Sequence, residues 1–137
     1  PEEGGVFLEE CRKTKLDFIP LLAPTTSDSR IKYLASFGTG FLYYVSRTGT
    51  TGVRSELSED LVSNLKRIHQ ATLLPVAVGF GISTADQARE VAQYAEGVVI
   101  GSAIVKRMAD AQGDVSRIKT ALREYLTPII QVLHSAD

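Results

Sequence analysis

The chain has 137 residues, of which 44% are hydrophobic and 23% charged, and its formal net charge is −1. This composition is typical of one globular domain large enough to bury a core, and the near-zero charge does not favour nucleic acid or an acidic membrane as a partner. No apolar run approaches the ~20 residues that cross a bilayer, and no signal-peptide pattern opens the chain. We therefore expect a single unit over residues 1–137 and a cytoplasmic location.

The first half of the chain predicts a helix followed by strand–helix units. The opening helix is expected at residues 2–13, with Val6, Phe7 and Cys11 on its apolar side. Cys11 is the only cysteine, which excludes an intrachain disulfide, and we interpret it as an inert helix residue. Strands of apolar, aromatic and β-branched residues are predicted along the whole chain at residues 18–22, 41–45, 76–78 and 97–100.

A helix is predicted after each strand. Thr26 or Ser27 is expected to cap the first of these helices, and Ser58 the second. The later helices are predicted at residues 83–94, 102–108 and 114–133. Pro128 is expected to kink or divide the last one.

Residues 75–83 have the sequence Pro-Val-Ala-Val-Gly-Phe-Gly-Ile-Ser. We expect the rest of the chain to be arranged around this segment. The first residues are typical of a strand buried on both faces. Gly79 and Gly81 allow backbone torsions and close approaches that a Cβ would block, and Ser83 is expected to cap the next helix. A buried strand, a glycine turn and a free helix N-terminus together predict a place where an anion can bind. Similar turns occur at residues 45–52 and 98–102.

Strict alternation of strands and helices predicts a parallel sheet with right-handed crossovers. About 25 residues per unit fit half of a (β/α)8 barrel, and the short helix predicted after the last strand occupies the place where such barrels often bind phosphate. We therefore predict the C-terminal half-barrel, with strands five to eight and their helices. A four-stranded doubly wound sheet is the competing architecture.

The glycine turns do not fit the common nucleotide motifs. A dinucleotide fingerprint would need a glycine where Thr84 stands and an acidic residue near Val98. No Gly-Lys-Ser/Thr sequence is present, which excludes a P-loop. Recurrence of Gly52, Gly81 and Gly101-Ser102 after three strands favours a phosphate site.

Five motifs in a fixed order carry a resemblance to a known family. They are Ala23-Pro24-Thr25-Thr26, Arg30-Ile31, Tyr43-Tyr44-Val45-Ser46-Arg47-Thr48-Gly49-Thr50-Thr51-Gly52, Val78-Gly79-Phe80-Gly81-Ile82-Ser83 and Gly101-Ser102-Ala103-Ile104-Val105. On these residues the chain resembles the tryptophan synthase alpha chain over almost its whole length. Related phosphate-binding barrels share the glycine turns but not the loop that contains Ser46 and Arg47.

The resemblance implies cleavage of indole-3-glycerol phosphate to indole and glyceraldehyde 3-phosphate, without a cofactor or metal, in complex with a tryptophan synthase beta chain. It implies that the phosphate is bound by Gly52, Gly81, Gly101 and Ser102. It implies that the substrate pocket is lined by Tyr43, Thr51 and Phe80. Residues 46–58, including Ser46, Arg47 and Gly49, would form a mobile loop that closes over the substrate.

The catalytic glutamate and aspartate of that family precede the matching region, so no catalytic residue is predicted in this chain. Glu56, Glu59 and Asp60 are interpreted as solvated or capping charges, and His69 and His134 as surface histidines. We expect the chain alone to be inactive. Its expected completing partner is a missing N-terminal half-barrel or a second, self-paired copy. Two alternatives stay open: a non-catalytic phosphate-binding half-barrel that works only as an assembly, and another phosphate-handling barrel enzyme such as an isomerase.

Overall fold

A computed structural model describes residues 2–46, 59–79 and 81–134 of the chain. In chain order, its elements are α1 (Gly5–Thr14), β1 (Leu21–Leu22), α2 (Asp28–Ala35), β2 (Leu42–Val45), α3 (Glu59–Ala71), β3 (Val76–Gly79), α4 (Ala85–Ala92), β4 (Gly97–Val99), α5 (Ser102–Asp110) and α6 (Val115–His134). The predicted alternation of strands and helices is confirmed. Across the described ranges, no helix combines the length and hydropathy needed to cross a bilayer.

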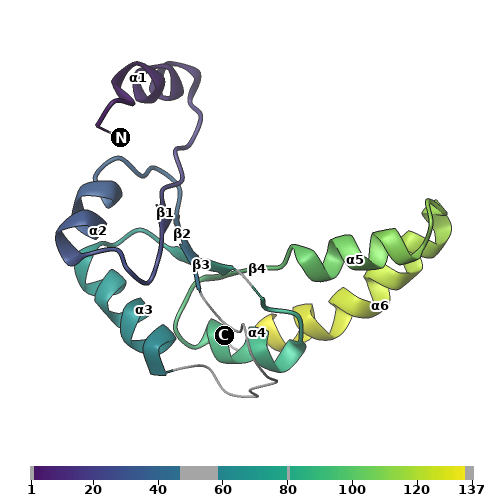
Figure 1. Cartoon of the computed structure of the whole chain (residues 1–137). Helices are drawn as coiled ribbons and strands as arrows, with labels where there is room; N and C mark the ends of the chain where they lie inside the picture. The colour runs from purple at the N-terminus through teal and green to yellow at the C-terminus, as the bar shows by residue number, and fades with distance from the viewer. Residues whose placement is uncertain (1, 47–58, 80, 135–137) are drawn as a thin grey trace.

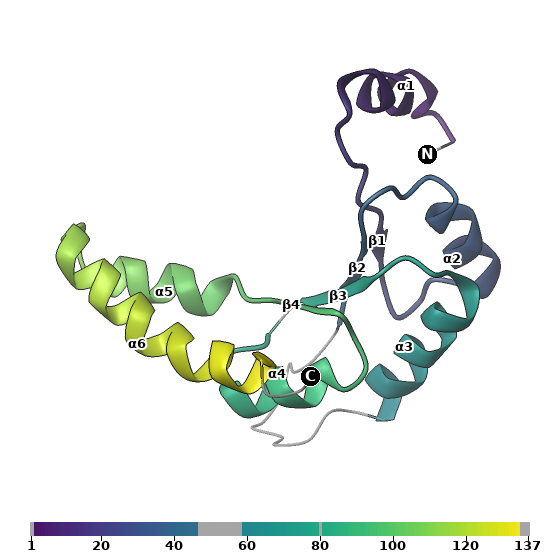
Figure 2. The ribbon, with the colours of Figure 1, turned by 180° about the vertical axis from the view of Figure 1, so that it is seen from behind.

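The four strands form one parallel sheet in the sequential order β1-β2-β3-β4. Helices α2, α3 and α4 lie on the same side of this sheet (Figures 1 and 2). A doubly wound sheet reverses its strand order and carries helices on both faces. The observed order and layering therefore fit a singly wound, barrel-type sheet and not the competing doubly wound one.

The two faces of the sheet differ sharply in burial. The strand residues under the helices are almost fully buried: Leu22, Leu42, Tyr44, Val76 and Val78. Successive side chains of a strand point to opposite faces, and the residues between these belong to the other face. That face carries Leu21, which is 65% exposed, and the half-buried residues Tyr43 and Ala77. We call it the open face, because none of the described elements covers it.

The open face corrects one expectation about β3. The sequence predicted a strand buried on both faces, but Ala77 is only half-buried. Parallel sheets occur almost always with both faces covered. The composition of β3 is thus typical of a strand covered on both faces, whereas the described elements cover only one.

Several element boundaries also differ from expectation. The first strand is only Leu21–Leu22 instead of residues 18–22. In α1 the buried residues are Leu8 and Cys11, whereas Val6 and Phe7 are exposed, so the predicted apolar side was wrong in part. Helix α6 continues through Pro128 as one element, so this residue does not divide the helix, and the kink that was expected as the alternative stays a prediction.

We predict that the 137-residue chain self-associates through the open face and the outer edges of β1 and β4, because apolar side chains and strand edges left uncovered invite pairing with another chain. Leu21→Glu should weaken this association in sedimentation velocity. Leu73→Glu, at a residue exposed outside the sheet, is the matched control and should not. A monodisperse monomer for the unmodified chain would contradict the prediction.

We also predict that the chain loses stability in alkali. Burial raises the pKa of the Tyr44 hydroxyl above its ordinary value of 10.0, and the charge of Arg67 only partly offsets this effect. The folded chain thus favours the protonated phenol, so this contribution to stability is complete below pH 10 and is lost as the pH rises above it. The free energy of unfolding in urea should fall above pH 10, and less steeply in Tyr44→Phe. Equal slopes in both proteins would refute this.

Candidate functional site

The carboxyl ends of β2, β3 and β4 lie at one edge of the sheet. Val45 pairs in register with Gly79, and Gly79 with Val99. Gly81 and Gly101 each follow one of these paired residues by two positions. The parallel register therefore brings two of the predicted phosphate-binding glycines to the same edge, where binding sites of open parallel sheets occur.

The N-terminus of α5 supplies free backbone donors at this edge. Gly101 is its N-cap residue and makes no side-chain capping bond, and Ser102 is the first helical residue. Among the described residues, no acceptor receives a hydrogen bond from the backbone N–H of Ser102 or Ala103. Both Gly101 and Ser102 are exposed. Free N–H groups and the positive end of the helix dipole make this terminus suitable for an anion.

The N-terminus of α4, in contrast, is closed by its own side chains, which corrects the sequence prediction. Thr84, and not Ser83, is the N-cap residue, and its hydroxyl accepts from the backbone N–H of Gln87. The Gln87 side chain accepts in return from the backbone N–H groups of Ser83 and Thr84. This capping box, visible in the sequence as Thr-x-x-Gln, leaves α4 few donors for a ligand.

The turn between β3 and α4 contains Gly81, the second of the glycines at this edge. Its φ of 87° lies in the left-handed region, where a β-branched residue would be strained. Gly81 is exposed, whereas the neighbouring Ile82 is 6% exposed and belongs to the core. The buried Ile82 thus fixes a turn whose glycine backbone faces solvent.

The end of β2 is held tightly against the end of β3. Both the backbone N–H and the hydroxyl of Ser46 donate to the carbonyl oxygen of Gly79, each at 3.0 Å. Ser46 is 2% exposed, so it forms the fixed end of the predicted loop. A Cβ at position 79 would overlap the Tyr43 hydroxyl, which explains the glycine there. Tyr43 thus lies on the open face beside the candidate site.

Five of the predicted site residues lie outside the described ranges. They are Arg47, Gly49, Thr51, Gly52 and Phe80. Their predicted roles in the mobile loop, the pocket and the phosphate site stay predictions.

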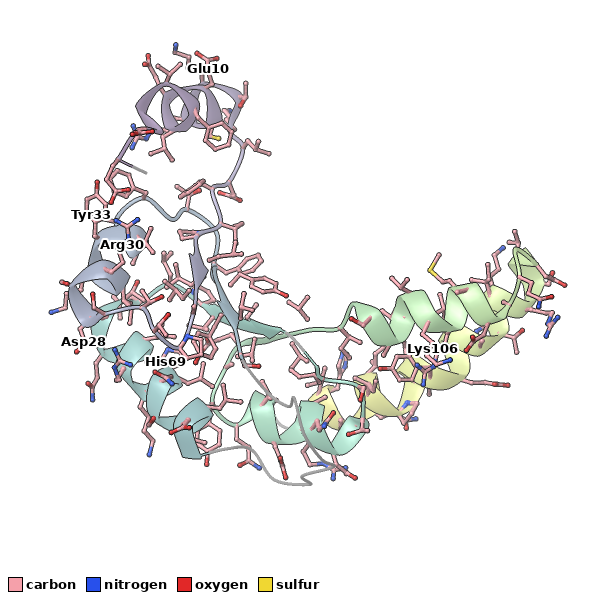
Figure 3. The ribbon with its side chains drawn as sticks, viewed as in Figure 1. Glu10, Asp28, Arg30, Tyr33, His69 and Lys106 are labelled. Atoms are coloured by element: carbon pink, nitrogen blue, oxygen red, sulfur yellow. The ribbon has the colours of Figure 1, made fainter. Side chains whose placement is uncertain are left out.

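Of the acidic and histidine side chains considered in the sequence, those of Asp60, His69 and His134 are described, and no hydrogen bond joins them to the glycine turns. Asp60 is exposed in the first turn of α3, and its backbone carbonyl accepts from Ser63 and Asn64. His134 is exposed near the C-terminal end of α6. His69 lies near the C-terminal end of α3, well separated from Lys106 of α5 (Figure 3), and its Nε2 lies 3.0 Å from the carbonyl oxygen of Tyr94. These three residues therefore form no acid–base pair at the glycine turns within the part of the chain that the structure describes.

A cavity of about 730 Å³ is present at the opposite edge, near the amino ends of β3 and β4. Its polar lining includes Lys66, His69 and Glu96. One Glu96 carboxylate oxygen accepts from the backbone N–H of Val76 at 2.7 Å, so this carboxylate helps to fix the start of β3. The cavity is therefore separate from the three strand ends that carry the glycine turns.

Comparison with known proteins identifies relatives that match most of this chain. The family described as "Tryptophan synthase alpha chain" matches residues 1–132. The chain is 49% identical over 113 residues to a tryptophan synthase alpha chain of Geobacter sp. strain M21, covering 82% of this chain and 42% of that protein. It is 46% identical over 129 residues to the alpha chain of Geobacter sulfurreducens, covering 90% of this chain and 49% of that one.

A solved structure titled as the tryptophan synthase α2β2 complex from Pyrococcus furiosus is also similar. Its matching chain superposes with a TM-score of 0.80 at 32% identity, covering 93% of this chain and 51% of that one. The present chain thus spans about half the length of the proteins that it matches.

We predict that backbone amides, rather than a lysine, determine anion binding at the glycine turns. Gly81→Val introduces both strain and a side chain at the turn, and should weaken binding of inorganic phosphate about tenfold or more in calorimetric titration, since one charge-assisted hydrogen bond is worth roughly 1.5–3 kcal/mol. Lys106→Ala should have little effect, because Lys106 is 74% exposed and pairs with Asp110.

The matched control is Gly113→Val, which imposes similar strain at a φ of 83° in the turn between α5 and α6. It should leave phosphate affinity unchanged. If Arg47→Ala abolishes binding while Gly81→Val preserves it, the anion depends on the arginine and not on the backbone.

Proposed function

Because this chain belongs to the tryptophan synthase alpha chain family, we propose that it forms the C-terminal half of a (β/α)8 barrel lyase and holds the phosphate end of its substrate. In this proposal, β1 to β4 are barrel strands five to eight. The substrate is indole-3-glycerol phosphate, and the products are indole and glyceraldehyde 3-phosphate.

The observation that carries the proposal is the shared edge of β3 and β4. A left-handed glycine turn and an uncapped helix N-terminus follow strands that are paired in register. Together they offer backbone donors to one anion from two directions. Gly81, Gly101 and Ser102 are the described members of this proposed phosphate site, and Gly52 would complete it.

The proposed half-barrel explains the open face. In a complete barrel, the inward side chains of all eight strands fill the interior, so Leu21, Tyr43 and Ala77 would be covered by the first four strands. The relatives are about twice as long as this chain, which is the length that eight strands and their helices require. Tyr43 would then line the substrate pocket, together with Thr51 and Phe80.

The proposed chemistry depends on groups that the described residues do not bring to this edge. Cleavage of the bond between the indole ring and the glycerol chain needs an acid that protonates the ring carbon and a group that accepts a proton. In this proposal both are carboxylates from the first half of the barrel. The present chain positions the phosphate, and residues 46–58 close over the substrate.

We further propose a tryptophan synthase beta chain as the partner that consumes the indole. The α2β2 assembly named for the Pyrococcus furiosus relative supports this proposal. A cytoplasmic location is part of the same proposal, as expected for a step in amino acid biosynthesis.

A second candidate function is a non-catalytic phosphate-binding assembly in which two copies of this chain cover each other's open faces. The exposed Leu21 favours this candidate, because a second copy would cover this apolar side chain. The two proposals differ in the partner that covers the open face: the first half of the barrel or a second copy.

We predict that the purified chain shows no cleavage of indole-3-glycerol phosphate above the buffer rate. Each general acid or base contributes about 10²–10⁴-fold to such a reaction, so loss of both removes nearly all measurable activity. Adding the first half of the Geobacter sulfurreducens relative should restore indole release. The same mixture with Gly81→Val is the control and should release much less. Activity of the chain alone would show that it contains its own catalytic groups.

A further inference from the structure

The side chain of Tyr125 on helix α6 contacts the turn after β3. The Tyr125 hydroxyl donates to the backbone carbonyl oxygen of Ser83 at 3.0 Å. Ser83 stands between the turn residue Gly81 and the N-cap of α4, and its own N–H is already bound to Gln87. Tyr125 therefore holds the Ser83 carbonyl, which is not part of the capping box.

The same tyrosine is also joined to the first turn of α5. The guanidinium carbon of Arg107 lies 3.4 Å from the centre of the Tyr125 ring. Arg107 Nη1 donates to the carbonyl oxygen of Ala103 at 2.7 Å. Ala103 directly follows Ser102, whose backbone N–H belongs to the proposed phosphate site.

We propose that Arg107 and Tyr125 form a bracket that sets the relation between the two turns of the phosphate site and thereby determines phosphate affinity. This inference rests on the proposed function, because it assigns positioning residues to the proposed site. The bracket runs from Ser83 through Tyr125 and Arg107 to Ala103. It connects the turn after β3 to the helix after β4 by contacts outside the sheet.

The stacking of Arg107 on Tyr125 suits a positioning role. A cation over an aromatic face is attracted by the ring, and the attraction is stronger where both groups are shielded from water. Burial raises the pKa of the Tyr125 hydroxyl, although the charge of Arg107 opposes the effect. The phenol therefore stays protonated at neutral pH and remains a hydrogen-bond donor to Ser83.

The bracket can be tested by two variants that break it at different points. Tyr125→Phe keeps the ring under Arg107 but loses the hydrogen bond to Ser83. Arg107→Gln removes both the cation over the ring and the hydrogen bond from Nη1 to the Ala103 carbonyl. Each should weaken binding of inorganic phosphate about threefold to tenfold, which lies within the range by which mutations between two coupled sites change binding. The double variant should bind about as weakly as the weaker single one, because both act through the same bracket.

The matched control is Lys106→Gln, which removes a positive charge from the same helix without touching Tyr125. It should change phosphate affinity less than twofold. Affinity is measured by calorimetry on the full chain at a temperature where urea titration shows every variant folded, since a purely structural role would lower stability and leave the affinity of the folded protein unchanged.

The outcomes separate this inference from the proposed function. If the unmodified chain binds phosphate and both variants bind it equally well, the bracket has no role in binding and only this inference fails. If the unmodified chain does not bind phosphate at millimolar concentration, the proposed phosphate site is wrong and the inference fails with it. An equal loss in Lys106→Gln would indicate a general effect of charge and would also overturn the bracket.

Discussion

The in-register parallel pairing of β2, β3 and β4 is the constraint on which the rest of the structure depends. It aligns Val45, Gly79 and Val99 across the sheet, and every turn that follows must therefore emerge at the same edge. Ser46 strengthens this alignment, because its backbone and its hydroxyl both donate to Gly79. A shift of register by one residue would place buried side chains on the open face, and it would separate the two glycine turns.

The described helices cover only one face of this sheet. Leu22, Tyr44 and Val78 join residues of α2, α3 and α4 in one core, while the opposite face is left to Leu21, Tyr43 and Ala77. This difference between the two faces supports the proposed function. The face that lacks a cover is the one that would line a barrel interior, and the edge that collects the glycine turns is the one where barrel enzymes bind their substrates.

Most of the fold could be predicted from the sequence, because strand composition, glycine turns and helix periodicity are local signals. Local signals also explain the errors. Ser83 and Thr84 are both good caps, and only the partnership of Thr84 with Gln87 selects between them. Val6 and Phe7 are apolar but exposed, because α1 stands apart from the sheet (Figure 1). The contact of Arg107 with Tyr125 could not be predicted, because it depends on how α5 packs against α6.

We propose above all that this sheet is half of a barrel whose strand ends hold a phosphate. A crystal structure of the chain with the first half of a relative and glycerol 3-phosphate tests it most directly. Strands of the first half should pair with β1 and β4, and a phosphate group should lie within hydrogen-bond distance of the backbone N–H groups of Gly81 and Ser102. A phosphate bound elsewhere, or an open face covered without pairing to β1 and β4, would contradict it.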